Sequence, residues 1–530
     1  MKKRLNIIGI SLFAFIAVLT CKPCNCLSSP SSSEKAKAIV TKQHISSRVQ
    51  SDVATQLNNQ AQSMYTQGKY DEAEFLFRRV LEIDEKDLGQ EHLDVAVSLS
   101  NLALVLKTKG KYIEAEILYR RALKILESQL GREDPDVATC LNNLASLLRE
   151  QEMYVETLSL NRRALAIREK KLGFDNPDVA TSMNNLGYSM LTQGKYAEAN
   201  SLIRRALEIR KKKLGSEDPA VANSLNTLAS LLLIQGKYAE AEHLNSRSLA
   251  IRETQLGSEH PDVAESLAVQ AALFIAQGRY REAEPLLRRA LEIDEKVFGK
   301  DHPNVATCLN NLATLLRTMG NYSEAEQLFR RSLAIYIKQL GSEHSTVAIS
   351  LSSLASLLQD KGKYTEAEPL FRRSLAIREK QLGSEHVSVA KGLNNLAVLL
   401  CTQGKYKEAE PLYRRALAIN EKKLGRDHVE VAKILYGIAS LLKDKGNYAE
   451  AEPLFRRSLA IFIKHLGIAH PDVATCLNGL AVLLENQGKY RESEPLYRRA
   501  LAIDEKALGV DHPTTRLYRN NLNSLLRKRL

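Results

Sequence analysis

A constant period of 42 residues runs through most of this chain. A tyrosine marks the same place in each period: Tyr70, Tyr112, Tyr154, Tyr196, Tyr238, Tyr280, Tyr322, Tyr364, Tyr406, Tyr448 and Tyr490. A glycine keeps the same step, from Gly89 to Gly509. Internal repetition of this kind predicts a stack of eleven similar units, each of which packs on its neighbours. The length of 530 residues is too great for one compact core and agrees with an elongated array.

The pattern within one period predicts two helices. Asp134 can cap a helix, Pro135 suits its first position, and residues 137–148 place their apolar side chains on one face. A second helix is predicted over residues 196–214, and Gly215 ends it. One such helical hairpin cannot bury its apolar face alone, so neighbouring repeats must supply the missing contacts.

Prolines fall inside several of the predicted second helices, each five residues after the repeated tyrosine. They are Pro285, Pro369, Pro411, Pro453 and Pro495. Proline removes a backbone donor and crowds the preceding turn, so we expect a mild kink or a later helix start at these places.

A row of histidines occupies the loop before the first helix of many repeats. The row comprises His92, His260, His302, His344, His386, His428, His470 and His512. Other repeats carry Asp134, Asn176 or Asp218 at this position, and such a set of residues is typical of helix N-caps. Because no histidine lies at helical ligand spacing from another in these loops, we predict caps and no metal site.

The repeat resembles a known family at the residues that matter for packing. Leu144 and Ala145 in the first helix, with Tyr112, Ala115 and Tyr119 in the second, resemble the tetratricopeptide pattern. The 42-residue form of residues 394–417 and 299–306 is similar to the kinesin light chain repeat. The resemblance implies an all-α, right-handed α-solenoid of eleven helix-turn-helix repeats over residues 49–512, with a C-terminal capping helix over 513–530.

The same resemblance implies a binding face. In that family the first helices line a concave groove that holds extended peptides, and asparagines there bond the peptide backbone. The matching positions are Asn58, Asn142, Asn184, Asn226, Asn310, Asn394 and Asn478. Helix geometry places Asn142 more than about 90° from the apolar face. Two interpretations remain open, namely peptide binding and a structural ladder between repeats.

The asparagine row is interrupted. Ser100, Ala268, Ser352 and Tyr436 occupy its position in other repeats. We therefore expect two or three sub-sites, the best of them around repeats 1 to 5, in place of one continuous groove.

The N-terminal residues differ from the array. Lys2, Lys3 and Arg4 precede an apolar run over residues 7–19, which predicts a signal peptide or membrane anchor over 1–26. Residues 27–48 are rich in serine and predict a flexible linker. We expect export to the periplasm, the cell envelope or the medium, and possible membrane association would go through this N-terminal segment.

The remaining chemistry favours binding over catalysis. No GxSxG, HExxH or GxxxxGK[ST] motif occurs, so we expect no enzyme, no cofactor and no small-molecule substrate. The net charge of +13 suggests acidic partners. The paired arginines of the second helices have glutamates at helical spacing, so ion pairs are preferred to nucleic-acid binding. We expect a scaffold for protein or peptide partners; the alternatives are a self-assembling structural element or a basic surface for an anionic polymer or membrane.

Overall fold

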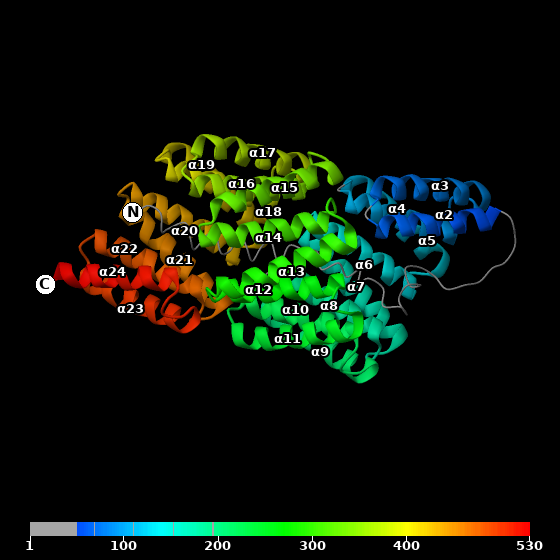
Figure 1. Ribbon diagram of the computed structural model, residues 1–530, viewed down its shortest axis with the longest axis horizontal. Coiled ribbons are helices and arrows are strands. Elements are labelled where there is room, and N and C mark those ends of the chain that lie inside the picture. The colour runs from blue at the N-terminus through cyan, green and yellow to red at the C-terminus, as the bar shows by residue number, and fades with distance from the viewer. Residues whose placement is uncertain (1–49, 68, 110, 152, 193–194, 530) are drawn as a thin grey trace.

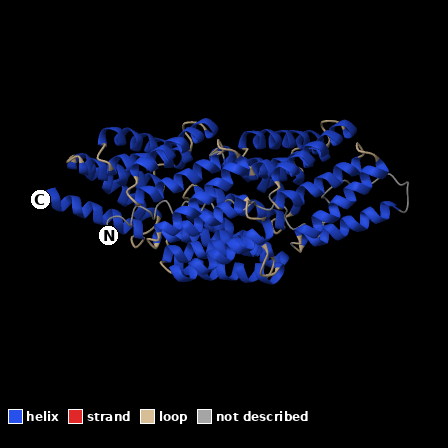
Figure 2. Cartoon of the chain, turned by 90° about the horizontal axis from the view of Figure 1, so that it is seen from above, coloured by secondary structure: helices blue, strands red, loops and turns tan. Residues whose placement is uncertain are grey.

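The computed structural model describes residues 50–529, apart from residues 68, 110, 152 and 193–194 (Figure 1). Throughout this part the chain forms helices joined by short loops, without any strand (Figure 2). The predicted signal peptide or anchor and the predicted linker lie outside the described residues. Among the described helices, none combines the length and the apolar character that crossing a membrane requires.

Two helices form each repeat, as the period predicted. The first helices are α2 Gln50–Thr66, α4 Leu93–Thr108, α6 Pro135–Glu150, α8 Pro177–Thr192, α10 Pro219–Ile234, α12 Pro261–Ala276, α14 Pro303–Met319, α16 Ser345–Asp360, α18 Val387–Thr402, α20 Val429–Asp444 and α22 Pro471–Asn486. The second helices are α3 Tyr70–Leu88, α5 Tyr112–Leu130, α7 Tyr154–Leu172, α9 Tyr196–Leu214, α11 Tyr238–Leu256, α13 Tyr280–Phe298, α15 Tyr322–Leu340, α17 Tyr364–Leu382, α19 Tyr406–Leu424, α21 Tyr448–Leu466 and α23 Tyr490–Ala507. A further helix, α24 Pro513–Arg529, follows the last repeat.

Local sequence signals account for the helix ends. The backbone N–H of Asp136 donates to the side chain of Asp134 at 2.8 Å, which confirms the predicted cap of α6. Gly215, which ends α9, has φ 90° and ψ 159°, a conformation that is essentially restricted to glycine. Any other residue there would strain the loop between repeats.

The prolines do not delay the second helices. Helices α13 and α19 contain Pro285 and Pro411, yet both begin at the repeated tyrosine and span 19 residues, as does the proline-free α9. The expectation of a later start was therefore wrong. Both prolines lie one and a half turns into the helix on its exposed side, where the carbonyl that loses its helical bond can face water.

Packing between the helices produces a curved array. Buried apolar side chains form one continuous core from Leu158 to Tyr518, and smaller clusters cover the first repeats. Ala145 and Ala206 are fully buried and allow close helix approach, as their small size predicted. Neighbouring first helices approach one another more closely than neighbouring second helices do. The first helices therefore line the inner wall of the curve, and the second helices form its outer side.

Each superhelical turn of the array contacts the next turn. Contacts join residues that lie 232 to 236 positions apart: Tyr70 with His302, Tyr112 with Ser345, Gln151 with His386, Ile234 with His470 and Tyr280 with His512. One turn thus takes about five and a half repeats of 42 residues. We call these contacts the seam. Helices α2 and α24 lie at opposite ends of the long axis (Figure 1).

Candidate partner-binding face

The seven asparagines predicted to bind peptide all lie on first helices, at one position of the inner wall. Asn184, Asn226, Asn310 and Asn478 are buried, with 3 to 5% of their surface exposed. Asn58, Asn142 and Asn394 are half-buried. The structure thus brings all seven onto one wall, although it leaves only some of them near solvent.

Most of these amides bond the neighbouring repeat. Asn101 Nδ2 donates to Asn58 Oδ1 at 3.0 Å, Asn142 Nδ2 to Ser182 Oγ at 3.3 Å, Asn184 Nδ2 to Thr227 Oγ1 at 3.5 Å, Asn226 Nδ2 to Glu265 Oε1 at 3.1 Å and Asn521 Nδ2 to Asn478 Oδ1 at 3.0 Å. These bonds have the geometry of the structural ladder that the sequence left open. They hold successive first helices in register.

Four of these amides nevertheless keep an unsatisfied oxygen. The Oδ1 atoms of Asn142, Asn184, Asn226 and Asn310 are buried and accept no hydrogen bond within the described protein. A buried acceptor without a donor costs about 1–3 kcal/mol, so a row of them calls for an explanation. Solvent does not reach these oxygen atoms from outside, so an internal ordered water is the donor that fits them.

Access to the inner wall varies along the array. In the middle, Val269 and Ala272 of α12 and Asn311 and Thr314 of α14 are buried. In α6, Asn143 and Ser146 stay half-buried, and the equivalent side chains of α18 do as well. The same two positions are exposed in repeat 1 and half-buried in repeats 4, 8 and 10, so the wall is more open toward both ends of the array than in its middle.

Tyr436 interrupts the row of amides in repeat 10. Its ring packs edge-on against Phe455, with centroids 5.5 Å apart. A side chain at Gly479 would lie 2.9 Å from Tyr436 and from Phe455, so the glycine makes room for the two rings. The aromatic ring replaces the amide as the contact between repeats, which explains this interruption of the row.

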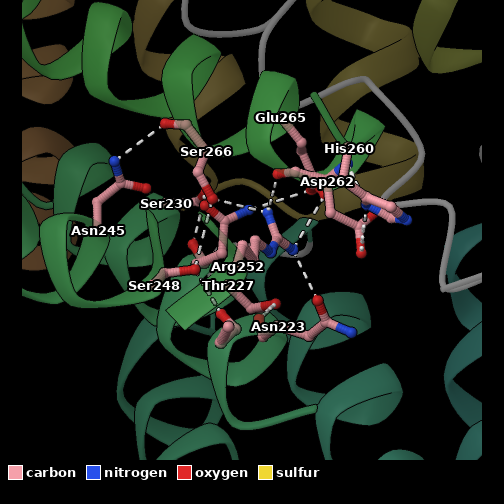
Figure 3. A network of polar contacts seen from close by, with 12 residues as sticks. Asn223, Thr227, Ser230, Asn245, Ser248, Arg252, His260, Asp262, Glu265 and Ser266 are labelled. Atoms are coloured by element: carbon pink, nitrogen blue, oxygen red, sulfur yellow. Dashed lines mark hydrogen bonds and ion pairs between the residues drawn. The ribbon is translucent and has the colours of Figure 1, made fainter. Parts of the chain in front are cut away.

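A buried arginine network links the second helices to the inner wall (Figure 3). Arg252 of α11 is 1% exposed and donates to Ser266 Oγ at 2.8 Å, to the Asp262 carbonyl at 2.7 Å and to Asn223 Oδ1 at 2.6 Å. It also forms an ion pair with Glu265 at 3.2 Å. One guanidinium group thereby fixes two successive first helices, α10 and α12.

Sequence reasoning missed this network. Its signal was a charged residue in an otherwise apolar stripe, repeated at the 42-residue step in Arg168, Arg210 and Arg252. Arg168 and Arg210 donate to the serine 14 residues later, as Arg252 does. Their burial and their bonds to two successive first helices make these arginines structural.

The outer arginine pairs are neutralised by glutamates. In most pairs the first arginine bonds a glutamate one turn earlier, as Arg288 does with Glu284 at 2.7 Å. The second often reaches the preceding repeat, as Arg331 does with Glu295 at 2.6 Å. This confirms the interpretation of the arginine stripe as ion pairs.

The histidines cap helices, as predicted. In α12, for example, the Asp262 backbone N–H donates to His260 Nδ1 at 3.1 Å. Sequence reasoning missed a second role, because the histidines from His302 onward also lie at the seam. The sequence signal for this second role is the change in cap residue along the chain. Every cap from residue 302 onward is histidine, whereas Asp134, Asn176 and Asp218 all belong to the first superhelical turn.

Two cysteines of the array, Cys140 and Cys476, lie in first helices. Cys140 and Cys476 are free and buried, and burial raises the pKa of each thiol to about 12. Within residues 50–529 as described, no group of three or more His, Cys, Asp or Glu side chains is arranged to hold a metal ion.

The fold and its inner wall define a class of protein, the helical-repeat solenoid that presents a concave face built from first helices. The tetratricopeptide repeat family matches residues 52–128, 136–212, 220–296, 270–338, 346–422, 430–506 and 472–528, and a second tetratricopeptide repeat model matches residues 184–255. The chain belongs to the tetratricopeptide repeat family. No curated protein matches it in sequence.

Several solved structures are similar. A set of nearly identical TPR-like repeats, assigned to a kinesin light chain of Podosopora anserina, is 31% identical and covers 38% of this chain and 96% of its own, with a TM-score of 0.34. Yeast Tom70 is 15% identical over 91% of this chain and 97% of its own, with a TM-score of 0.42. BtubC from P. vanneervenii is 22% identical over 44% of this chain and 91% of its own, with a TM-score of 0.35.

Proposed function

We propose that this protein is a non-enzymatic scaffold whose inner wall binds extended segments of partner proteins. Tetratricopeptide solenoids are typical of protein–protein interaction, and this chain belongs to that family. The observation that carries the proposal is the half-buried state of paired amides on the inner wall, Asn142 with Asn143 and Asn394 with Asn395. An amide side chain both donates and accepts, so it can pair with the backbone of an extended guest.

The spacing of the wall suits an extended chain. Packed helices lie about 8–10 Å apart, and an extended strand rises about 3.3 Å per residue. One guest could therefore donate to successive repeats at intervals of about three residues. The Asn142–Asn143 and Asn394–Asn395 pairs mark two sub-sites, because these side chains stay half-buried.

The first sub-site also carries a positive charge. Arg149 lies over the ring of Tyr188, with its guanidinium carbon 4.9 Å from the ring centroid. The chain as a whole carries a formal charge of +13. Segments with acidic side chains beside an extended backbone are the partners that this wall fits best.

Selection from a phage-displayed library of linear peptides tests the proposal. Asn143→Ala with Asn395→Ala should weaken the selected peptides about tenfold or more, since the loss of a few bonds on each guest amounts to about 1–3 kcal/mol. Asn184→Ala with Asn226→Ala should mainly lower stability. The matched control carries Ser159→Ala, Ser201→Ala and His243→Ala on the exposed outer side of repeats 3 to 5. Peptide affinity that depends on the outer set and not on the inner pairs would refute the inner-wall site.

The N-terminal segment adds a proposal about location. Its basic start and apolar run over residues 7–19 support export, with either cleavage or retention as an anchor. Determining the N-terminus of the protein purified from its own cells tests this. An uncleaved Met1 on protein recovered in the soluble cell extract would argue against it.

A further inference from the structure

The seam leaves one row of tyrosines uncovered at the C-terminal turn. The tyrosines concerned are Tyr322, Tyr364, Tyr406, Tyr448 and Tyr490, and all are half-buried. In the first superhelical turn, Tyr70, Tyr112 and Tyr238 are 8 to 9% exposed, whereas Tyr154, Tyr196 and Tyr280 are half-buried. Burial at the seam still raises the pKa of Tyr280 to about 12. Among the described residues, none is placed against these five rings as His302 is placed against Tyr70. We call their turns, residues 319–322, 361–364, 403–406, 445–448 and 487–490, the tyrosine rim.

The first superhelical turn presents the opposite half of the same contact. Its loops hold residues 90–94, 132–136, 174–178 and 216–220, and we call them the loop rim. They are equivalent to the loops that carry His302 and His470 in the seam, but no described tyrosine contacts them as Tyr70 contacts His302. Glu91 and Asp94 of this rim are exposed, and Asp134 and Asp178 are half-buried.

The two rims are complementary in backbone and in chemistry. Each repeats the elements that already meet in the seam, namely a turn before a second helix and a loop before a first helix. A tyrosine hydroxyl, which lies 3.2 Å from His302 Nε2 in the seam, can donate equally to the oxygens of Asp134 or Asp218.

Charge adds to this complementarity. The tyrosine rim carries lysines and no acidic residue: Lys361, Lys363, Lys405, Lys445 and Lys489. The loop rim is acidic, with Arg132 as its one basic residue. The side chains of Lys363 and Lys405 are 43 to 44% exposed and form surface ion pairs within the chain. Breaking such an ion pair to form a new one with a second molecule costs little free energy, because an exposed pair contributes only about 0–1 kcal/mol.

We propose that these rims dock on each other in two copies of this chain, head to tail. The occupant of each rim is thus a second copy, and the contact continues the seam from one molecule into the next. A head-to-tail contact uses different surfaces on the two partners and does not close, so assembly should grow with concentration into rods. This contact does not involve the inner wall and stands apart from peptide binding.

Sedimentation velocity of the wild-type chain over a concentration series is the first test. The weight-average mass should rise with concentration at low salt and fall as salt screens the charged rims. A single monomeric species at every concentration and at low salt would overturn the proposal.

Rim variants locate the contact. Tyr364→Ser with Tyr406→Ser should shift association to at least tenfold higher concentration. The matched control changes exposed residues of the same two helices, Pro369→Ser with Pro411→Ser, and should associate like the wild type. Circular dichroism checks that each variant is folded. Association that survives the tyrosine changes would place the contact elsewhere and refute the proposal.

A charge exchange tests whether the two rims meet each other, and it does not depend on the tyrosine variants. Asp94→Lys with Asp178→Lys reverses the loop rim, and Lys363→Glu with Lys405→Glu reverses the tyrosine rim. Each double variant alone should stay monomeric, because like charges then face each other. An equimolar mixture should assemble, because every rim again finds its opposite. Failure of the mixture to assemble, or undiminished assembly of either variant alone, would contradict head-to-tail docking.

Discussion

His470 shows at the residue scale how one side chain serves both a helix and a contact between superhelical turns. Its Nδ1 accepts from the Asp472 backbone N–H at 3.1 Å, and its Nε2 lies 3.1 Å from the Ile234 carbonyl oxygen. The neutral tautomer with the proton on Nε2 satisfies both bonds. An aspartate or asparagine could make the first bond but is too short to make the second.

Exchange of this histidine for asparagine should therefore separate the two roles. His470→Asn keeps a helix cap but loses the ring and leaves the Ile234 carbonyl without its donor, so we expect a loss of about 1–2 kcal/mol in the free energy of unfolding. His92→Asn is the control, since His92 caps α4 with a side chain that is 45% exposed. It should change stability by less than about 0.5 kcal/mol. Urea unfolding followed by circular dichroism measures both, and equal losses would contradict the second role.

Burial gives the seam histidines a pH dependence. Burial lowers the pKa of His344, His470 and His512 to about 4 each, against about 6.5 in an unfolded chain. The Ile234 bond raises the pKa of His470, and nearby Lys433 lowers it further. Between pH 6.5 and 4 the unfolded chain binds more protons, so stability is full above pH 6.5 and falls as pH decreases toward 4.

Thermal unfolding across this pH range provides the measurement. The melting temperature of the wild type should fall from pH 6.5 to 4 more steeply than that of a variant with His344→Asn, His470→Asn and His512→Asn. The variant carries the same carboxylates, so the difference isolates the histidines. Parallel curves for the two proteins would show that the histidines do not contribute.

At the scale of the element, the prolines of the second helices are a local cost that the stack overrides. Pro411 lies inside α19, which still runs from Tyr406 to Leu424. Pro411→Ala restores a helical donor and should raise stability by about 1 kcal/mol or more, because proline disfavours a helix interior. The reverse change, Gln327→Pro in α15, should lower it by a similar amount. Shifts in the urea midpoint test both, and an unchanged midpoint for both would mean that the lost bond is replaced by water.

Much of each element was predictable because its signals are local. The caps at Asp134 and His260, the glycine end at Gly215 and the small residues at Ala145 and Ala206 all act within one or two helices, and all were found from the sequence. The inner-wall site was only partly predictable. Helix periodicity places Asn142 on the wall, but its bond to Ser182 depends on how far the next repeat is rotated. That rotation is a property of the packed interface.

At the scale of the whole molecule, the seam could not be predicted from one repeat. It joins residues 232 to 236 positions apart, and that distance depends on small rotations summed over about five and a half repeats. The cap residues reflect this contact, since histidine replaces the Asp134, Asn176 and Asp218 type of cap in the later repeats. That pattern can be interpreted only when the number of repeats in one superhelical turn is known. The pitch also decides how much of the inner wall stays open, since the first helices of the middle repeats bury their inner side chains.

The seam should also control the length of the molecule. Tyr70, Tyr112 and Tyr238 are 8 to 9% exposed in or beside the seam, so Tyr→Ala at these three positions removes rings that hold one turn against the next. We expect a larger maximum dimension in small-angle X-ray scattering at unchanged helical content, and a loss of about 1–3 kcal/mol for each buried ring. The matched control has Tyr→Ala at Tyr322, Tyr364 and Tyr406, the same repeat position outside the seam. Measured in dilute, high-salt solution, this control should keep the wild-type dimension, because stacking of neighbouring repeats alone sets the curvature there. Equal lengthening of both variants would mean that the tyrosines act within their own repeats and that the turns are held together by other contacts.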